Sequence, residues 1–223
     1  MKSKPDSDYL ELFENNKNWA SHYSAANSND HERFSVVNSP DILFIGCCDN
    51  RIPASTLMGI DPGKVIVHRN IGNQVISIDA NSMSVIHYAI EHLKVKRIIV
   101  CGHYDCGCIK TAINPKDYGT LNSWLKSIRD VYKEHKVELN EIADKGKRLD
   151  RLSELNVLEQ CGNIAKTAVV QNNFNDSGIP QVHGWIFNAY DGTIKDLGFD
   201  FSGTIDKIQQ IYSQTSESFF DAE

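Results

Sequence analysis

The chain has 223 residues, of which 41% are hydrophobic and 23% charged, and its net charge is −6 at pH 7. This length and composition are typical of one globular domain. An acidic chain without clustered cations favours neither nucleic acids nor anionic membranes as partners. The apolar runs are too short to cross a bilayer, and the first residues show no export signal or presequence, which predicts a cytoplasmic protein.

In chain order, the polar segment at residues 5–35 is expected to form one or two helices. Residues 41–48, DILFIGCC, are a continuous apolar run, which is typical of a strand buried on both faces. A Pro-Gly turn and a second short strand are predicted within residues 60–70. The polar arm therefore precedes a buried core.

The next two elements form a helix and a strand. Residues 81–96 carry apolar side chains at helical spacing, with Asn81 or Ser82 as the expected cap. Residues 97–103, RIIVCGH, are predicted to be a third buried strand. Strands that alternate with helices in this way predict a parallel sheet covered on both faces.

Downstream, helices are predicted at residues 121–135 and 151–174, and Cys161 falls at an apolar position of the second. A hairpin around Asp191 and Gly192 is expected within residues 181–201. A last helix covers roughly residues 203–218. The predicted organisation is a single domain over residues 1–223, with an N-terminal helical arm at 1–35, an α/β core at 36–202 and a C-terminal helical segment at 203–223.

Six cysteines are present, and five of them lie in two short groups, at positions 47 and 48 and at positions 101, 106 and 108. Disulfide frameworks are typical of short secreted chains. Grouped cysteines in this chain therefore favour metal or redox chemistry. Cys101 and Cys161 are expected in the core.

Both groups follow the carboxyl end of a predicted strand, which is where ligands bind in parallel α/β sheets. If the chain stays extended, Cys47, Asp49 and Arg51 project to one side and Cys48 to the other. His103 and Cys106 are three residues apart, a spacing that a turn can close on one ion. Two thiolates and an imidazole suit Zn²⁺.

Arg51 indicates a catalytic zinc site rather than a structural one. Its guanidinium can pair with Asp49 and draw the carboxylate away from the metal, which leaves a position for water. Bound zinc lowers the pKa of water into the neutral range.

These segments resemble the β-class carbonic anhydrases. The matching text is CCDNR for the family's C-x-D-x-R pattern, VHRNIGN, CGHYDCG for its H-x-x-C pattern, and HGW. The resemblance runs from about residue 35 to residue 200, and HYDCG, with IKT one residue further on, is closer to fungal members. It implies an α/β fold with a central, mainly parallel sheet flanked by helices and an N-terminal helical arm.

The resemblance implies the reversible hydration of CO₂ to bicarbonate and a proton by zinc-bound hydroxide, with one Zn²⁺ per chain. Cys47, His103 and Cys106 would hold the zinc throughout. Asp49 would bind the zinc in a closed, inactive form. In the open form it would pair with Arg51 and accept a hydrogen bond from the zinc hydroxide.

In the family, the closed form is coupled to a bicarbonate site built from a tryptophan, an arginine and a tyrosine. Arg69 matches the arginine, but Phe44 and Phe187 stand in place of the two aromatic donors. We therefore expect a weak bicarbonate site and an open, water-bound zinc at neutral pH.

Further roles are implied by alignment with the family. Tyr88 and His92 align with residues proposed as proton shuttles in plant members, and their spacing places them on one helical face. Asn38 stands where many members have a glutamine that contacts the substrate across a dimer interface. Gly107 is the other expected substrate contact.

Three further positions depart from the family: Cys48 and Asn50 replace serines, and Cys108 replaces a glycine. Cys48 is expected to be a packed thiol. A redox pair of Cys106 and Cys108 is a weaker interpretation than the metal site.

The resemblance also implies a homodimer or a tetramer of dimers. Two other functions stay open: a carbonyl sulfide or carbon disulfide hydrolase on the same fold, and a non-catalytic zinc protein. Asp49 and Arg51 argue against the last, because a structural zinc site needs neither.

Overall fold

The computed structural model describes residues 7–26, 39–49, 51, 53–61 and 63–212. Contacts divide the chain into two units, residues 1–38 and 39–223. The first unit contains helix α1 (Ser7–Ala26), in which the rings of Tyr9 and Phe13 meet edge to face. A helix in the N-terminal arm was predicted; the single-domain organisation stays a prediction.

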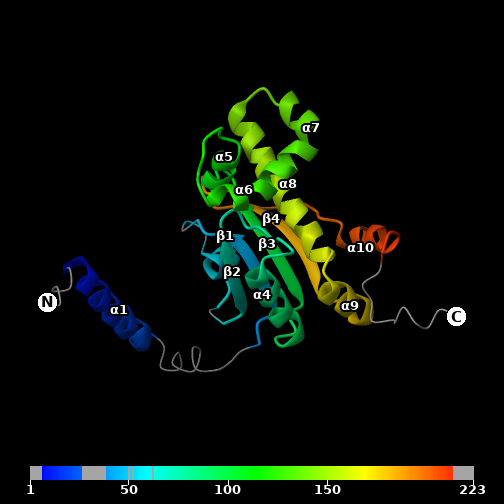
Figure 1. The fold of residues 1–223 in the computed structure, drawn as a ribbon. Helices are drawn as coiled ribbons and strands as arrows, with labels where there is room; N and C mark the ends of the chain where they lie inside the picture. Colours follow the sequence, from blue (N-terminus) through cyan, green and yellow to red (C-terminus); the bar gives the residue numbers. More distant parts are fainter. Residues whose placement is uncertain (1–6, 27–38, 50, 52, 62, 213–223) are drawn as a thin grey trace. The chain divides into compact units, whose positions relative to one another are not determined.

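Within the described residues of the second unit, five strands form one sheet in the order β2-β1-β3-β4-β5 (Figure 1). The first four strands run parallel, and β5 pairs antiparallel with β4. This arrangement confirms the predicted mainly parallel α/β fold. The strands are β1 (Ile42–Cys47), β2 (Val65–Asn70), β3 (Arg97–His103), β4 (Gln181–Phe187) and β5 (Ile194–Asp196).

The strand register brings the two chemically unusual segments to one edge of the sheet. Gly46 of β1 is paired with Cys101 of β3, and Cys47 is paired with Asn70 of β2. Because the strands are parallel, Cys47 and His103 both end their strands at the carboxyl edge.

Helices cover both faces of the sheet, as the continuous apolar strands predict. One core packs α4, α9, α10 and part of α8 against side chains such as Leu43 and Ile45. The other packs α3, α5, α6, α7 and the remainder of α8 against side chains such as Phe44 and Ile99. The helices are α3 (Ala54–Met58), α4 (Ala80–Glu91), α5 (Gly107–Ala112), α6 (Leu121–Glu134), α7 (Lys136–Glu141), α8 (Lys145–Ala165), α9 (Ala168–Ser177) and α10 (Phe201–Gln209).

Two expectations about helices were wrong. The α4 cap is Asp79, whose carboxylate accepts hydrogen bonds from the backbone N–H groups of Asn81 and Ser82. The single helix expected at 151–174 is two helices, because Thr167 has extended backbone angles and separates α8 from α9.

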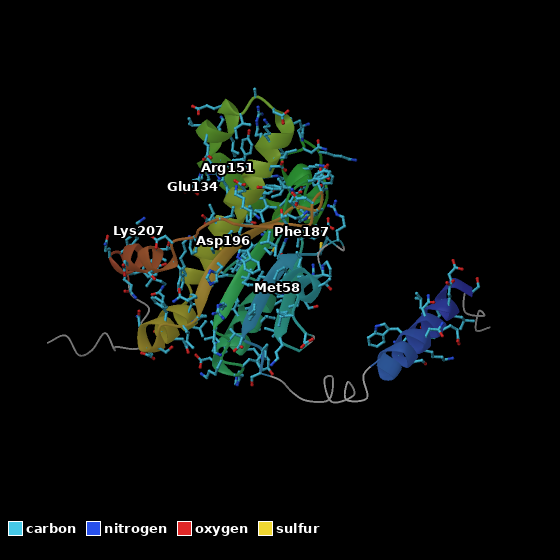
Figure 2. All side chains as sticks on the ribbon, turned by 180° about the vertical axis from the view of Figure 1, so that it is seen from behind. Met58, Glu134, Arg151, Phe187, Asp196 and Lys207 are labelled. Carbon is cyan, nitrogen blue, oxygen red and sulfur yellow. The ribbon has the colours of Figure 1, made fainter. Side chains whose placement is uncertain are left out.

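The hairpin prediction is confirmed. Gly192, with φ of 75°, lies in the turn between β4 and β5. Phe187 and Asp196 end these two strands and are labelled in Figure 2. Helix α10 begins at Phe201, and part of the expected helix at 203–218 lies outside the described residues. In the part of the chain that the structure describes, no helix combines the length and apolar character needed to cross a bilayer.

Candidate metal centre

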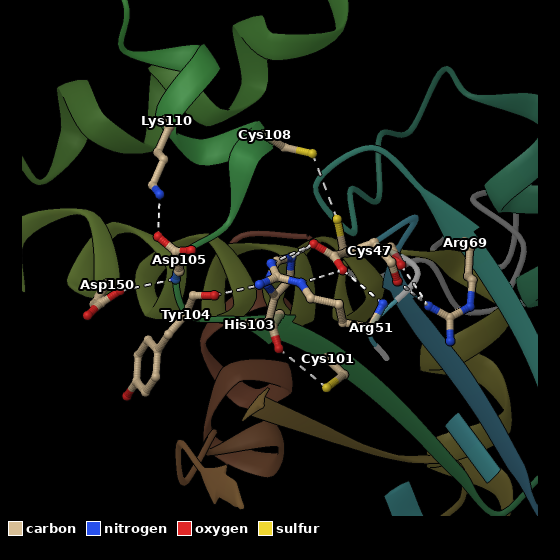
Figure 3. Close-up of polar contacts among 12 residues, drawn as sticks. Cys47, Arg51, Arg69, Cys101, His103, Tyr104, Asp105, Cys108, Lys110 and Asp150 are labelled. Atoms are coloured by element: carbon tan, nitrogen blue, oxygen red, sulfur yellow. Dashed lines mark hydrogen bonds and ion pairs between the residues drawn. The ribbon is translucent and has the colours of Figure 1, made fainter. Parts of the chain in front are cut away.

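The carboxyl edge of the sheet gathers the predicted ligands (Figure 3). Cys47 and His103 end β1 and β3, and Cys106 is the N-cap residue of α5. Asp105 makes the sharp turn between β3 and α5 with a left-handed φ of 56°, which aspartate tolerates better than most residues. Its carboxylate pairs with Lys110. Cys47, His103 and Cys106 are all buried.

His103 presents a free nitrogen lone pair to this site. Its Nδ1 lies 2.9 Å from the carbonyl oxygen of Tyr104, and a carbonyl can only accept, so Nδ1 carries the hydrogen. The other nitrogen, Nε2, is buried and has no hydrogen-bond partner among the described residues. A histidine that is oriented through one nitrogen and unpartnered at the other has the arrangement of a metal ligand.

The electrostatics of the site favour a cation. Burial lowers the pKa of His103, but the neighbouring sulfur atoms of Cys106 and Cys47 outweigh it and raise the pKa to about 10. Hydrogen bonds to Cys106 and Cys108 lower the pKa of Cys47 well below its usual range, against the effect of burial. A metal cation at Nε2 would take the place of the proton that these sulfur atoms favour on His103. Two thiolates and an imidazole are preferred Zn²⁺ donors, so the residues fit this ion.

Asp49 is held by the backbone and side chain of Arg51. Its Oδ1 accepts hydrogen bonds of 2.9 Å from both the backbone N–H and Nε of Arg51, and its Oδ2 accepts one of 2.8 Å from Nη2. The hydrogen bond from the Arg51 side chain holds the pKa of Asp49 below its usual value. Oδ2 lies 3.7 Å from Nε2 of His103, so the carboxylate borders the candidate metal position.

Arg69 supports the loop that carries Asp49. Its Nη1 donates hydrogen bonds to the carbonyl oxygens of Cys47, at 2.8 Å, and of Asp49, at 3.4 Å. Its guanidinium lies over the ring of Phe44, 5.9 Å from the centroid. Arg69 thus fixes the backbone on both sides of Cys48.

A cavity of about 310 Å³ opens beside these groups. Cys47, Asp49 and His103 contribute to its wall, together with the apolar side chains of Ile71, Leu121 and Leu125. Gly107 also lines it, and a β-carbon at that position would meet nothing within 4 Å. Gly107 thus lies on the cavity wall, and its role as a substrate contact stays a prediction. Asn38 lies outside the described residues.

Tyr88 and His92 are not brought to this cavity. Their rings lie 5.4 Å apart, which confirms the shared helical face, and both line a different cavity along α4. His92 immediately follows α4, before the amino end of β3, whereas His103 ends that strand. The seven-residue strand separates the two ends by roughly 20 Å at about 3.3 Å per residue. This distance is therefore too long for direct proton transfer between the cavity and His92 of the same chain.

Cysteine assignments at the site were partly wrong. Cys48 is exposed rather than packed, while Cys101 and Cys161 are core residues as expected. Cys108 was not assigned as a ligand, yet among the described residues the sulfur atoms of Cys47, Cys106 and Cys108 all lie within 4.8 Å of one another. The sequence did contain a signal for this residue, because Cys108 stands where the family has a glycine.

Known proteins share this architecture. The carbonic anhydrase family pattern matches residues 42–194. A carbonic anhydrase of Emericella nidulans is 51% identical over 207 residues, covering 93% of this chain and 91% of that protein. The β-carbonic anhydrase CafA of Aspergillus fumigatus has a TM-score of 0.84 at 32% identity, over 93% of this chain and 99% of its own. One of two tetrameric β-carbonic anhydrases of Sordaria macrospora has a TM-score of 0.82 at 34% identity, over 86% and 98%. This chain belongs to the β-class carbonic anhydrase family.

Proposed function

We propose that the protein catalyses the reversible hydration of CO₂ to bicarbonate and a proton with one Zn²⁺ held by Cys47, His103 and Cys106. The observation that carries this proposal is the buried, unpartnered Nε2 of His103 beside two cysteine sulfur atoms. Bound zinc would supply Lewis acidity that brings the pKa of water into the neutral range, an effect for which carbonic anhydrases are a standard example.

Asp49 has the geometry of an orienting residue. Because Arg51 keeps its carboxylate ionised, Asp49 can only accept hydrogen bonds. A water molecule in the cavity that donates to Oδ2 would have its lone pairs turned away from Asp49 and towards a substrate. The bonds from Arg51 also oppose rotation of Asp49 towards the metal, which disfavours closure of the site by Asp49.

The cavity wall suits the substrate. CO₂ is linear and has no net dipole, so apolar side chains can receive it without leaving a polar group unpaired. Ile71, Leu121 and Leu125 supply such a surface next to Asp49. Bicarbonate is charged, so the same wall favours its release into water.

Stopped-flow CO₂ hydration by zinc-quantified protein tests the proposal. We expect fast hydration at about one zinc per chain, rising through a single ionisation between pH 6.5 and 9. Carbonyl sulfide and carbon disulfide should be assayed beside CO₂, because turnover of these alone would favour the hydrolase alternative. Absence of all three activities at full zinc loading would contradict an enzymatic role.

Assembly and location are further proposals. We infer a homodimer or a tetramer of dimers, which the tetrameric relatives of Sordaria macrospora support. Light scattering of the purified protein gives the oligomer. A cytoplasmic location stays a prediction that imaging of the tagged full chain would test.

A further inference from the structure

A third cysteine reaches the candidate metal centre. Cys108 lies in the first turn of α5, two residues after Cys106, and lines the same cavity as Cys47, Asp49 and His103. Its sulfur is 3.8 Å from that of Cys47, a contact drawn in Figure 3. Cys108 belongs to neither of the two ligand patterns of the family, C-x-D-x-R and H-x-x-C.

The distance between the Cys47 and Cys108 sulfur atoms matches that of two ligands that share one ion. Two thiolates bound to a tetrahedral zinc at about 2.3 Å lie about 3.8 Å apart. The distance between the Cys47 and Cys108 sulfur atoms has this value, and Cys106 lies within 4.8 Å of both. A weak S–H···S hydrogen bond can have the same length, so this distance alone does not decide between the two interactions.

The unpartnered nitrogen of His103 favours the metal. Nε2 is buried and neighbours the Cys47 and Cys106 sulfur atoms, so a nitrogen donor lies beside the cluster of three sulfur atoms. If the bound metal displaces the Cys108 proton into solvent, three thiolates and one imidazole would be the four ligands of a closed zinc site. Asp49, which would otherwise close the site, is already held by three hydrogen bonds from Arg51.

We propose that Cys108 is a third sulfur ligand of the metal and closes the resting site in place of Asp49. This inference rests on the proposed zinc function. A water molecule would then bind only after the Cys108 sulfur leaves the metal. The site would thus alternate between a form with three sulfur ligands and a form with two.

X-ray absorption at the zinc edge counts sulfur ligands without relying on activity. The samples are the reduced, zinc-loaded wild type, Cys108→Ser, Cys108→Ala and Cys48→Ser. Cys48→Ser is the matched control, because Cys48 also lines the cavity but lies outside the cluster of three sulfur atoms. We expect three sulfur ligands in the wild type and in Cys48→Ser, and two in both Cys108 variants. Turnover per bound zinc should rise in Cys108→Ser.

Two sulfur ligands in the wild type, unchanged in the Cys108 variants, would overturn this inference and leave the proposed function intact. A wild type that binds no zinc would overturn both. Cys108→Ala covers the case in which the serine oxygen replaces the sulfur as a ligand. Circular dichroism of each variant shows whether it is folded.

Discussion

Two buried histidines on strands that flank β1 have opposite surroundings. His68 of β2 has its Nε2 3.1 Å from the hydroxyl of Ser82 and 3.2 Å from the amide nitrogen of Asn70. His103 of β3 has its Nδ1 against the Tyr104 carbonyl and an Nε2 with no partner among the described residues. The first histidine joins a strand to a helix, and the second is prepared for a ligand.

Their ionisation separates them further. Burial lowers the pKa of both rings, and at His68 it remains the dominant effect. At His103 the neighbouring sulfur atoms of Cys106 and Cys47 reverse it. Burial alone therefore does not identify a metal-binding histidine; the identity of the neighbouring groups does.

The largest expected effect is the loss of zinc from His103→Ala. This change removes a nitrogen ligand, so we expect zinc content to fall well below that of the wild type and CO₂ hydration to approach the uncatalysed rate. His68→Gln is the matched control and should retain its zinc, because His68 bonds only within the fold. Metal analysis after gel filtration measures both. Equal zinc content in the two variants would remove the distinction between these histidines.

A smaller loss is expected from Arg51→Gln. Zinc should stay bound, since Arg51 contacts Asp49 and not the sulfur atoms. Activity should fall by about 10–100-fold, the usual effect of removing a group that orients a metal-site residue. Arg51→Lys keeps the charge but not the paired hydrogen bonds, so it should recover only part of the activity. Full activity in Arg51→Gln would show that Asp49 needs no orientation.

Asp79→Ala is expected to lower the stability of the region around His68. Asp79 caps α4 and accepts a hydrogen bond from Ser82, which in turn contacts His68. We expect the free energy of unfolding in urea to fall by about 1–2 kcal/mol, with zinc content unchanged. Asp144→Ala removes the cap of α8, which has one such bond, and should cost less. An equal cost in the two variants would mean that the link to His68 adds nothing.

The amino-acid pattern predicted the strands and their shared edge because the physics is local. β3 runs from Arg97 to His103, as predicted, since a buried parallel strand is a continuous apolar run with polar ends. Parallel strands also end together, so the pattern of apolar runs was enough to place Cys47 and His103 at one edge. The break at Thr167 was missed because the apolar spacing continues across it.

The positions that side chains take in the folded chain were not predictable in the same way. The four-residue spacing correctly predicted that Tyr88 and His92 share one helical face. It did not predict the end of the sheet at which His92 lies, after the last residue of α4. Cys108 was missed because the short helix α5 decides where its sulfur points. Spacing alone suggested only a redox pair. Ligands whose position depends on the path of a following helix therefore cannot be assigned from spacing.

The smallest expected effect is the pH dependence that His68 gives to stability. Its folded pKa lies below the ordinary value of 6.5, so well above pH 6.5 the ring is neutral in both states and its contribution is complete. As the pH falls below 6.5, the unfolded chain gains a proton that the folded chain resists, and stability declines until the lowered pKa is reached. Between pH 6.5 and 6.0 the loss should be under about 0.7 kcal/mol. Urea unfolding of wild type and His68→Gln over this range gives the free energy of unfolding of each protein against pH. The difference between the two slopes is the effect of His68, since acid release of zinc is common to both proteins. Parallel slopes would show that His68 takes up its proton equally well in the folded chain, and its separation from His103 would then rest on hydrogen bonding alone.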